Sequence, residues 1–242
     1  MYQQYCGRLT IRMGLLVFTT YLLIFQGSVL DFTSQFGPSH GITFINLLWI
    51  YFMAELIADF FPRHYISIGN EKQFMREFRP TKKDRSVLTD TIKEADRSAF
   101  WVFVVWTIPN LAIGFLYHQG IFVTKQILLW LCVFYFAADL ICVLFFCPFQ
   151  YFIMKNRCCV TCRIFKWDSL MTFTPLFFVS GTFSASLLLV SAILGFLWEY
   201  RLKKYPERFF EQTNQALKCS QCTTYMCRTK FQKFRPKKLK KN

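Results

Sequence analysis

Long apolar stretches alternate with shorter polar segments along most of the chain. Four of these stretches have about the 20 residues that a helix needs to cross a bilayer. They occupy residues 13–30, 42–61, 100–117 and 126–147. Because hydrocarbon offers no partner for backbone polar groups, stretches of this kind are expected to be helices. The pattern predicts an all-α fold, a polytopic transmembrane helix bundle with four clear spans.

A fifth hydrophobic region, residues 170–198, is too long for one straight span and too short for two ordinary ones. Pro175 and Gly181 interrupt it, and hydroxyl side chains flank the glycine. The favoured interpretation is a broken hairpin, because non-helical backbone is tolerated at membrane depth only where protein covers it. A single long, kinked and tilted helix is the alternative.

Basic residues indicate how the spans are oriented. Two arginines precede the first span, nine basic residues follow the second, and the loop 31–41 has none. The loop 148–168 has four basic residues. Under the positive-inside rule, the N-terminus and the loops 62–98 and 148–168 are cytosolic. Thirteen basic residues place the tail there too, and a hairpin would return the chain to that side. The predicted domains are a transmembrane bundle (1–200) and a basic, cysteine-containing tail (201–242). Interfacial helices are expected over residues 70–79 and 86–97 of the cytosolic loop 62–98, and a further helix over residues 206–217 of the tail.

The composition supports a membrane location. Hydrophobic residues make up 54% of the 242-residue chain, which is more than one soluble core of this size needs, yet the net charge is +15. The charges flank the spans, so the expected partners are the lipid bilayer and anionic head groups rather than nucleic acid. The basic tail is also a candidate surface for protein partners. The sequence has no nucleophile elbow, phosphate loop or His-Glu-x-x-His motif, so an enzyme is not expected.

An internal two-helix repeat is a further expectation. One set of equal spacings relates Pro62, Tyr65 and Asn70 to Pro148, Tyr151 and Asn156. A second set relates Arg97, Trp101 and Pro109 to Arg163, Trp167 and Pro175. Repeats with the same orientation would form a small bundle, and polar sites often lie between such repeats.

Two cysteine clusters are the strongest candidates for metal binding. The candidate ligands are Cys158, Cys159, Cys162, Cys219, Cys222 and Cys227. Each cluster contains a Cys-x-x-Cys loop, which points two thiolates toward one site, and two such loops complete a tetrahedral zinc site. An iron–sulfur cluster is the alternative, because six thiols exceed the needs of one zinc ion. Disulfides in an external tail and acylation of Cys158 and Cys159 remain open as well.

Acidic residues inside the spans form a second candidate site. Glu55 and Asp59 are four residues apart on one helix face, and Asp139 lies in the fourth span. On a helical wheel, Cys132 lies within about 20° and Cys142 within about 60° of Asp139. Such a polar site fits a cation or a proton path, because buried acids in spans usually face a cavity or a partner. Alternatively, Asp59 reaches the interface, Asp139 bonds a neighbouring helix through Tyr135 or Asn46, and the cysteines only pack.

Several segments from residue 127 to residue 227 carry a resemblance. They read DLICV, CPFQ, MKNRCC, TCRIFKWD, YPERF and CSQC. Together they resemble an uncharacterised group of cysteine-rich multipass bacterial membrane proteins, a group to which no function is attached. The resemblance implies a bacterial inner membrane; in a eukaryote the endoplasmic reticulum is the expected location.

Three hypotheses about function follow from these patterns. The first is a membrane protein that holds a metal, zinc above all, between two cytosolic cysteine clusters, with the carboxylates as an ion or proton path. The second is a small secondary transporter or channel in which Glu55 and Asp139 carry the function. The third is a membrane anchor subunit of a larger complex.

Overall fold

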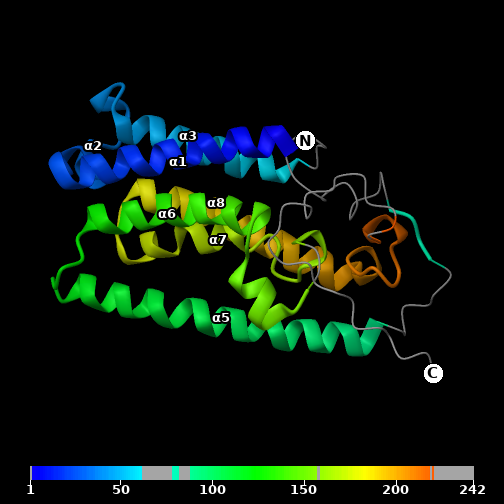
Figure 1. Ribbon diagram of the computed structural model, residues 1–242. Helices are drawn as coiled ribbons and strands as arrows, with labels where there is room; N and C mark the ends of the chain where they lie inside the picture. The colour runs from blue at the N-terminus through cyan, green and yellow to red at the C-terminus, as the bar shows by residue number, and fades with distance from the viewer. Residues whose placement is uncertain (1, 62–77, 82–87, 157–158, 219, 221–242) are drawn as a thin grey trace.

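Figure 1 shows a bundle of helices whose long axes run in roughly the same direction. The computed structural model describes residues 2–61, 78–81, 88–156, 159–218 and 220. The long helices are α1 (Tyr2–Phe25), α3 (Phe44–Phe60), α5 (Thr89–His118), α6 (Lys125–Leu144) and α8 (Thr182–Lys204). Within the described ranges the secondary structure is helical apart from an isolated bridge between Pro80 and Asn214. The prediction of an all-α bundle is confirmed.

Short elements connect the long helices. Between α1 and α3 lie η1 (Gly27–Leu30), α2 (Phe32–Gln35) and η2 (Pro38–His40). Between α6 and α8 lie the π-helix η4 (Phe149–Met154), η5 (Cys159–Thr161), α7 (Asp168–Phe173) and η6 (Thr174–Phe178). After α8 come η7 (Pro206–Arg208) and η8 (Gln215–Leu217). Thr43 and Thr124 begin α3 and α6, since each side-chain oxygen accepts a bond from a backbone N–H in the first turn.

Four helices are long and apolar enough to cross a membrane, namely residues 3–25 of α1 together with α5, α6 and α8. Large apolar side chains on these helices point away from the bundle. More than half exposed are Val17, Ile24, Phe103, Ile108, Phe115 and Phe196. A soluble monomer rarely exposes so much apolar surface, whereas lipid covers it without cost. The chain therefore has the surface of an integral membrane protein, and its orientation stays a prediction.

Two helices begin earlier than the hydrophobic pattern indicated. The first apolar stretch was expected from residue 13, but α1 already begins at Tyr2. Helix α5 is continuous from Thr89 through its apolar half, so residues 89–98 belong to this helix and not to a separate interfacial one. Neither junction contains a proline or a cap that would stop a helix, and polar residues continue a helix without difficulty. The remaining expected interfacial helix, between residues 70 and 79, falls almost entirely outside the described residues.

The fifth hydrophobic region forms two antiparallel pieces. Helix α7 and the 3-10 turn η6 run in one direction, the chain reverses at residues 179–181, and α8 returns alongside. Gly181 has φ +156° at the reversal, a backbone conformation that L side chains rarely adopt. Figure 1 places the N-terminus and the C-terminal end of α8 at the same end of the bundle, here called the charged end. The break in this region is therefore confirmed, as a hairpin and not as one kinked helix.

The α7–η6 segment lies at the centre of the packing. It contacts α6 on one side and α8 on the other, and η6 also reaches α5. Phe173 and Leu176 are almost fully buried in the main core, and the Phe173 ring packs edge-on against Phe52 at 5.2 Å. The same Phe52 ring packs edge-on against Phe136 of α6 at 5.2 Å. One short segment thus joins α3, α6 and α8, which explains how a helix of six residues persists inside a bundle.

Residues 205–217 pack onto the charged end. The Phe209 ring meets Trp198 of α8 edge-on at 5.0 Å, and Leu217 lies in a small apolar cluster with Leu140, Leu144 and Val160. A single helix from Pro206 to Leu217 was expected, but the chain forms two 3-10 turns instead. The side chain of Asn214 is buried between them and accepts bonds from the N–H groups of residues 79 and 216. These local bonds compete with helix formation.

The expected repeat has no matching secondary structure in its second set of residues. Arg97, Trp101 and Pro109 all lie within the continuous helix α5. Their counterparts Arg163, Trp167 and Pro175 lie in a turn, before α7 and in η6. In the first set, Pro62, Tyr65 and Asn70 fall outside the described residues, so that part stays a prediction.

Gly114 provides a test of the packing between α5 and η6. A Cβ atom on this residue would lie 2.2 Å from the Phe178 ring, so Gly114→Ala forces the ring or the helix to move. We expect the substitution to lower the free energy of unfolding by about 1–3 kcal/mol, the usual cost of overpacking. Thermal unfolding of detergent-solubilised protein measures the change.

Gly14→Ala is the matched control, because Gly14 also lies inside a long helix but has no atom within 4 Å of the added Cβ. There alanine should leave the melting temperature unchanged or raise it through its higher helix propensity. Equal effects of the two substitutions would contradict the close approach of η6 to α5.

Candidate functional site

Arg12 lies in the middle of α1 and faces the interior of the bundle. It is 6% exposed, its Nη2 is 3.2 Å from Glu55 Oε2 on α3, and its Nη1 is 3.2 Å from Asp139 Oδ2 on α6. The same Nη1 donates to the Phe136 carbonyl at 2.8 Å, and the guanidinium stacks 3.6 Å above the Phe136 ring. One cation therefore links three helices through a fork that a lysine could not reproduce.

A second ion pair lies one turn nearer the charged end. Asp59, at the end of α3, accepts a bond from Lys166 Nζ at 2.6 Å. Burial lowers the pKa of Lys166, but the surrounding carboxylates, Asp59 first and then Asp168 and Asp139, outweigh burial and raise it above its usual value. Lys166 therefore stays charged and binds α3 to the segment that precedes α7.

Asp168 begins α7 beside these two pairs. Its Oδ1 accepts bonds from the backbone N–H and the hydroxyl of Ser169. Together with Glu55, Asp59 and Asp139 it makes four carboxyl groups near two cations, Arg12 and Lys166; we call these six residues the charge cluster. With every carboxyl ionised the charge cluster carries an excess of negative charge, which favours the uptake of a proton or another cation.

Two cavities meet at the charge cluster. The smaller, of about 40 Å³, is lined by Arg12, Glu55 and Asp59, and it holds about one water molecule. The larger, of about 300 Å³, lies between α6, the π-helix η4 and the start of α7. Asp139 and Asp168 line both cavities. These two carboxylates therefore stand between a small polar space and a larger, mostly apolar one.

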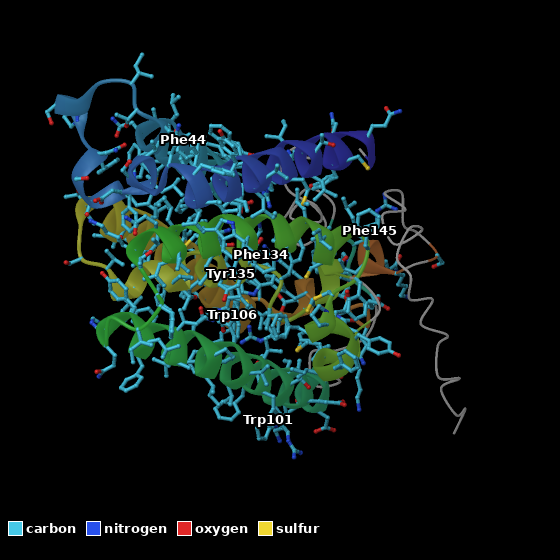
Figure 2. All side chains as sticks on the ribbon, turned by 60° about the vertical axis from the view of Figure 1, so that its left-hand side comes forward. Phe44, Trp101, Trp106, Phe134, Tyr135 and Phe145 are labelled. Atoms are coloured by element: carbon cyan, nitrogen blue, oxygen red, sulfur yellow. The ribbon has the colours of Figure 1, made fainter. Side chains whose placement is uncertain are left out.

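Aromatic side chains form much of the wall of the larger cavity. The Trp106 ring of α5 lies 4.6 Å from the Tyr135 ring of α6, and Figure 2 shows both rings in the space between these helices with Phe134 close by. Trp106 Nε1 donates to Thr174 Oγ1 at 3.2 Å, which holds the indole in place. The wall is completed by Phe149 of η4 and by Phe165.

The expected intramembrane site is assembled in part. Glu55 and Asp139 meet through Arg12, and Asp59 joins the charge cluster through Lys166. Cys142 lines the larger cavity with Asp139, whereas Cys132 is fully buried in the main core next to the backbone of Leu176. Cys132 therefore lies apart from the acids, even though the helical wheel placed it near Asp139.

The alternative partners considered for Asp139 make other contacts. Tyr135 donates its hydroxyl to Asn110 of α5 at 3.4 Å. Asn46 donates to the carbonyls of Gly37 and Gly41, and so holds the turn before α3. Asp59 does not simply reach the interface either, since it is paired with Lys166.

The cysteine clusters are described only in part. Cys162 is buried against Ala99 and Val102 of α5 and lines the larger cavity. The residues Cys158, Cys219, Cys222 and Cys227 and the side chain of Cys159 lie outside the described part of the chain. Within the described part, no group of three or more His, Cys, Asp or Glu side chains is placed to hold a metal ion.

Sequence reasoning missed the cations of the site and Asp168. Arg12 was counted as a charge that flanks the first span, and Lys166 as a charge of a cytosolic loop. A signal was present, because residues 2–25 contain no proline and a helix that begins at Tyr2 carries Arg12 to the depth of Glu55. Asp168 precedes the fifth hydrophobic region directly, and its depth depends on how that region enters the bundle.

A further ion-pair network fixes the turn before α7. Arg163 donates to both carboxylate oxygens of Glu199 on α8 at 2.6 Å and to Asp96 on α5 at 2.8 Å. Trp167 Nε1 donates to Glu199 as well, at 2.8 Å. Paired forks of this kind are among the strongest hydrogen bonds in proteins, so the turn that carries Lys166 and Asp168 is held from two sides.

An ion pair at the opposite end serves as a reference for the charge cluster. Lys125 Nζ lies 2.7 Å from Asp31 Oδ2, and both side chains are partly exposed. Burial raises the pKa of Asp31, but hydrogen bonds from Lys125 and Thr33 outweigh it and hold the pKa at about 2. This pair borders neither of the two cavities.

Comparisons with known proteins add no relative: no family model, curated protein or solved structure matches this chain. Function is therefore argued from the site itself.

The charge balance around Arg12 is testable by Arg12→Gln. This change leaves Glu55 and Asp139 facing each other without their cation, and we expect it to lower the free energy of unfolding by about 3–5 kcal/mol. Chemical or thermal unfolding in detergent gives the value. Adding Glu55→Gln and Asp139→Asn should recover much of the loss, because the two acids that Arg12 paired then carry no charge.

Lys125→Met is the control, since it breaks a partly exposed pair worth about 0–1 kcal/mol. If the triple variant is as unstable as Arg12→Gln, the arginine acts through packing and not through its charge.

Proposed function

We propose that the protein is a small secondary transporter in which protons and a cationic solute compete for the same partly buried carboxylates. One observation carries this proposal: Asp139 and Asp168 line both the small polar cavity and the larger apolar cavity. A group that borders two spaces can release a proton toward one and bind a solute in the other. The proposal develops the hypothesis that Glu55 and Asp139 carry the function.

The charge cluster supplies the driving force for binding. A carboxylate near the centre of a membrane span costs about 2.5–3.5 kcal/mol on insertion scales, so four of them require compensation. Arg12, between Glu55 and Asp139, and Lys166, beside Asp59, compensate two of the four negative charges. The remaining negative charge favours a bound proton or a bound cationic solute, one in place of the other.

Competition for the same carboxylates gives coupled exchange. When a proton binds at Asp139 or Asp168, it removes the charge that attracts the solute, and a bound solute lowers the affinity for the proton by the same factor. Protons and solute then cross the membrane in opposite directions if the site opens first to one end of the bundle and then to the other. Broken helices at such sites are common in secondary transporters, and α7 with η6 is a broken segment of this kind.

Proton exchange in proteoliposomes tests the proposal. Vesicles loaded at acidic pH with a pH-sensitive dye are diluted into sodium, potassium, tetramethylammonium or benzyltrimethylammonium chloride. At least one of these cations should release internal protons in a protein-dependent way. Asp139→Asn and Glu55→Gln should each lower the initial rate about tenfold or more, because they remove a charge that the exchange needs.

Asp31→Asn is the matched control and should keep the full rate, since this acid lies at the opposite end of the bundle. Unchanged rates in both Asp139→Asn and Glu55→Gln, or the absence of exchange with all four cations, would refute the proposal.

A metal site between the two cysteine clusters is a second candidate, and one contact favours it. Val160 follows Cys159 directly and Leu217 precedes Cys219 by two residues, and both lie in the same buried apolar cluster. Residues adjacent in sequence to each cysteine cluster thus belong to one buried apolar cluster, which supports this candidate. Zinc would hold the tail onto the bundle there, with thiolates as ligands, and an iron–sulfur cluster is the alternative cofactor.

Elemental analysis of the purified full-length protein tests this candidate. We expect about one equivalent of zinc per chain, lost in Cys159→Ser and in Cys222→Ser because each variant removes a thiolate ligand. Cys6→Ser is the control, since Cys6 is a reduced thiol on α1. Metal-free wild-type protein, or equal metal content in all variants, would exclude the site.

A further inference from the structure

The larger cavity has the size and walls of a small-molecule site. Its volume of about 300 Å³ lies at the lower end of the range for ligand pockets. The wall is mostly apolar, and it includes the rings of Trp106, Phe134 and Tyr135. Aromatic rings present a negative face, so they favour a cation that enters among them.

The charged groups that face this cavity all have one sign. Asp139 and Asp168 line it, and among its described lining residues there is no lysine, arginine or histidine. The neighbouring cations point elsewhere: Arg12 lines only the smaller cavity, and Lys166 binds Asp59. An anion would meet two carboxylates and no basic side chain in the cavity wall. A neutral ligand would leave the excess negative charge of the charge cluster in place, because Arg12 and Lys166 serve four carboxyl groups.

From this arrangement we infer that the larger cavity binds a lipophilic organic cation, such as an amine or quaternary ammonium compound with an aromatic or aliphatic body. The cationic group lies at Asp139 and Asp168, and the body lies against Trp106 and Tyr135. This inference deepens the proposed function, on which it rests, because it names the class of solute that competes with the proton.

A third cavity, between α5 and η6, gives room for a longer body. Its volume is about 370 Å³, and it shares Trp106 and Met171 with the larger of the two cavities at the charge cluster. Helix α5 contacts the bundle mainly through η4 and η6. Trp106 lines both this cavity and the larger cavity, so we expect the position of its ring to limit the length of the ligand that fits.

Benzyltrimethylammonium is a suitable probe because an uncharged molecule of the same shape, neopentylbenzene, exists. Equilibrium binding of the radiolabelled cation to detergent-solubilised full-length protein is measured at one pH, with unlabelled competitors. The cation should compete at least about tenfold better than neopentylbenzene, and benzylsulfonate should not compete, because charge decides recognition.

Asp168→Asn preserves the size of the side chain and an oxygen that accepts the Ser169 N–H bond. It should weaken binding of the cation about tenfold or more, and should bring the cation and neopentylbenzene to similar affinity. Asp31→Asn, at the opposite end of the bundle, should bind as the wild type does.

A variant of the aromatic wall keeps the test decisive if Asp168→Asn does not fold. Trp106→Leu keeps an apolar wall but removes the ring, so it should weaken the binding of the cation more than the binding of neopentylbenzene. Equal competition by the cation and its uncharged counterpart in the wild type, or no binding of either, would overturn the inference.

The outcomes separate the inference from the proposed function. Proton exchange with sodium or potassium, without binding of benzyltrimethylammonium, would support the transporter and refute the organic-cation site. Binding of benzyltrimethylammonium without proton exchange would support the site and refute the transporter.

Discussion

The guanidinium of Arg12 is the interaction on which the rest of the interior depends. It holds a carboxylate on α3 and another on α6, and a backbone carbonyl accepts from the same nitrogen that reaches Asp139. Without this cation, two acids would lie unpaired at the junction of three helices, at a cost that a bundle of this size cannot absorb. The position of α1 against α6, the largest helix contact in the structure, therefore has an electrostatic as well as an apolar basis.

The short segment α7–η6 depends on the same region. A helix of six residues has no stability of its own, so it must be held by its surroundings. Phe173 and Leu176 anchor it in the core, while Lys166 and Arg163 tie the preceding turn to α3, α5 and α8. The result is that Asp168 stands at the start of a broken segment, inside the bundle and beside Asp139, where a continuous helix would have placed an apolar side chain.

The charge cluster and the aromatic cavity share a wall, and this shared wall is the reason to consider them one site. Buried ion pairs alone are often structural, and an apolar cavity alone is often filled by lipid. Here the two cations leave an excess of negative charge on the four acids, and no basic side chain lines the larger cavity beside Asp139 and Asp168. A negatively charged site lined by aromatic rings differs in chemistry from a thiolate site such as the cysteine clusters would form.

Much of the fold follows from local pattern. The lengths of the apolar stretches determine that the chain is a helical membrane bundle, because only helices satisfy their own backbone in lipid. The break near Gly181 and the buried acids Glu55 and Asp139 were also readable, since a glycine in an apolar run and a carboxylate in a span are rare for physical reasons. The partners were not readable: Arg12, Lys166 and Asp168 look like charges that flank spans. Pairing depends on how deep each helix sits and which faces meet, and only packing between segments far apart in the chain sets both.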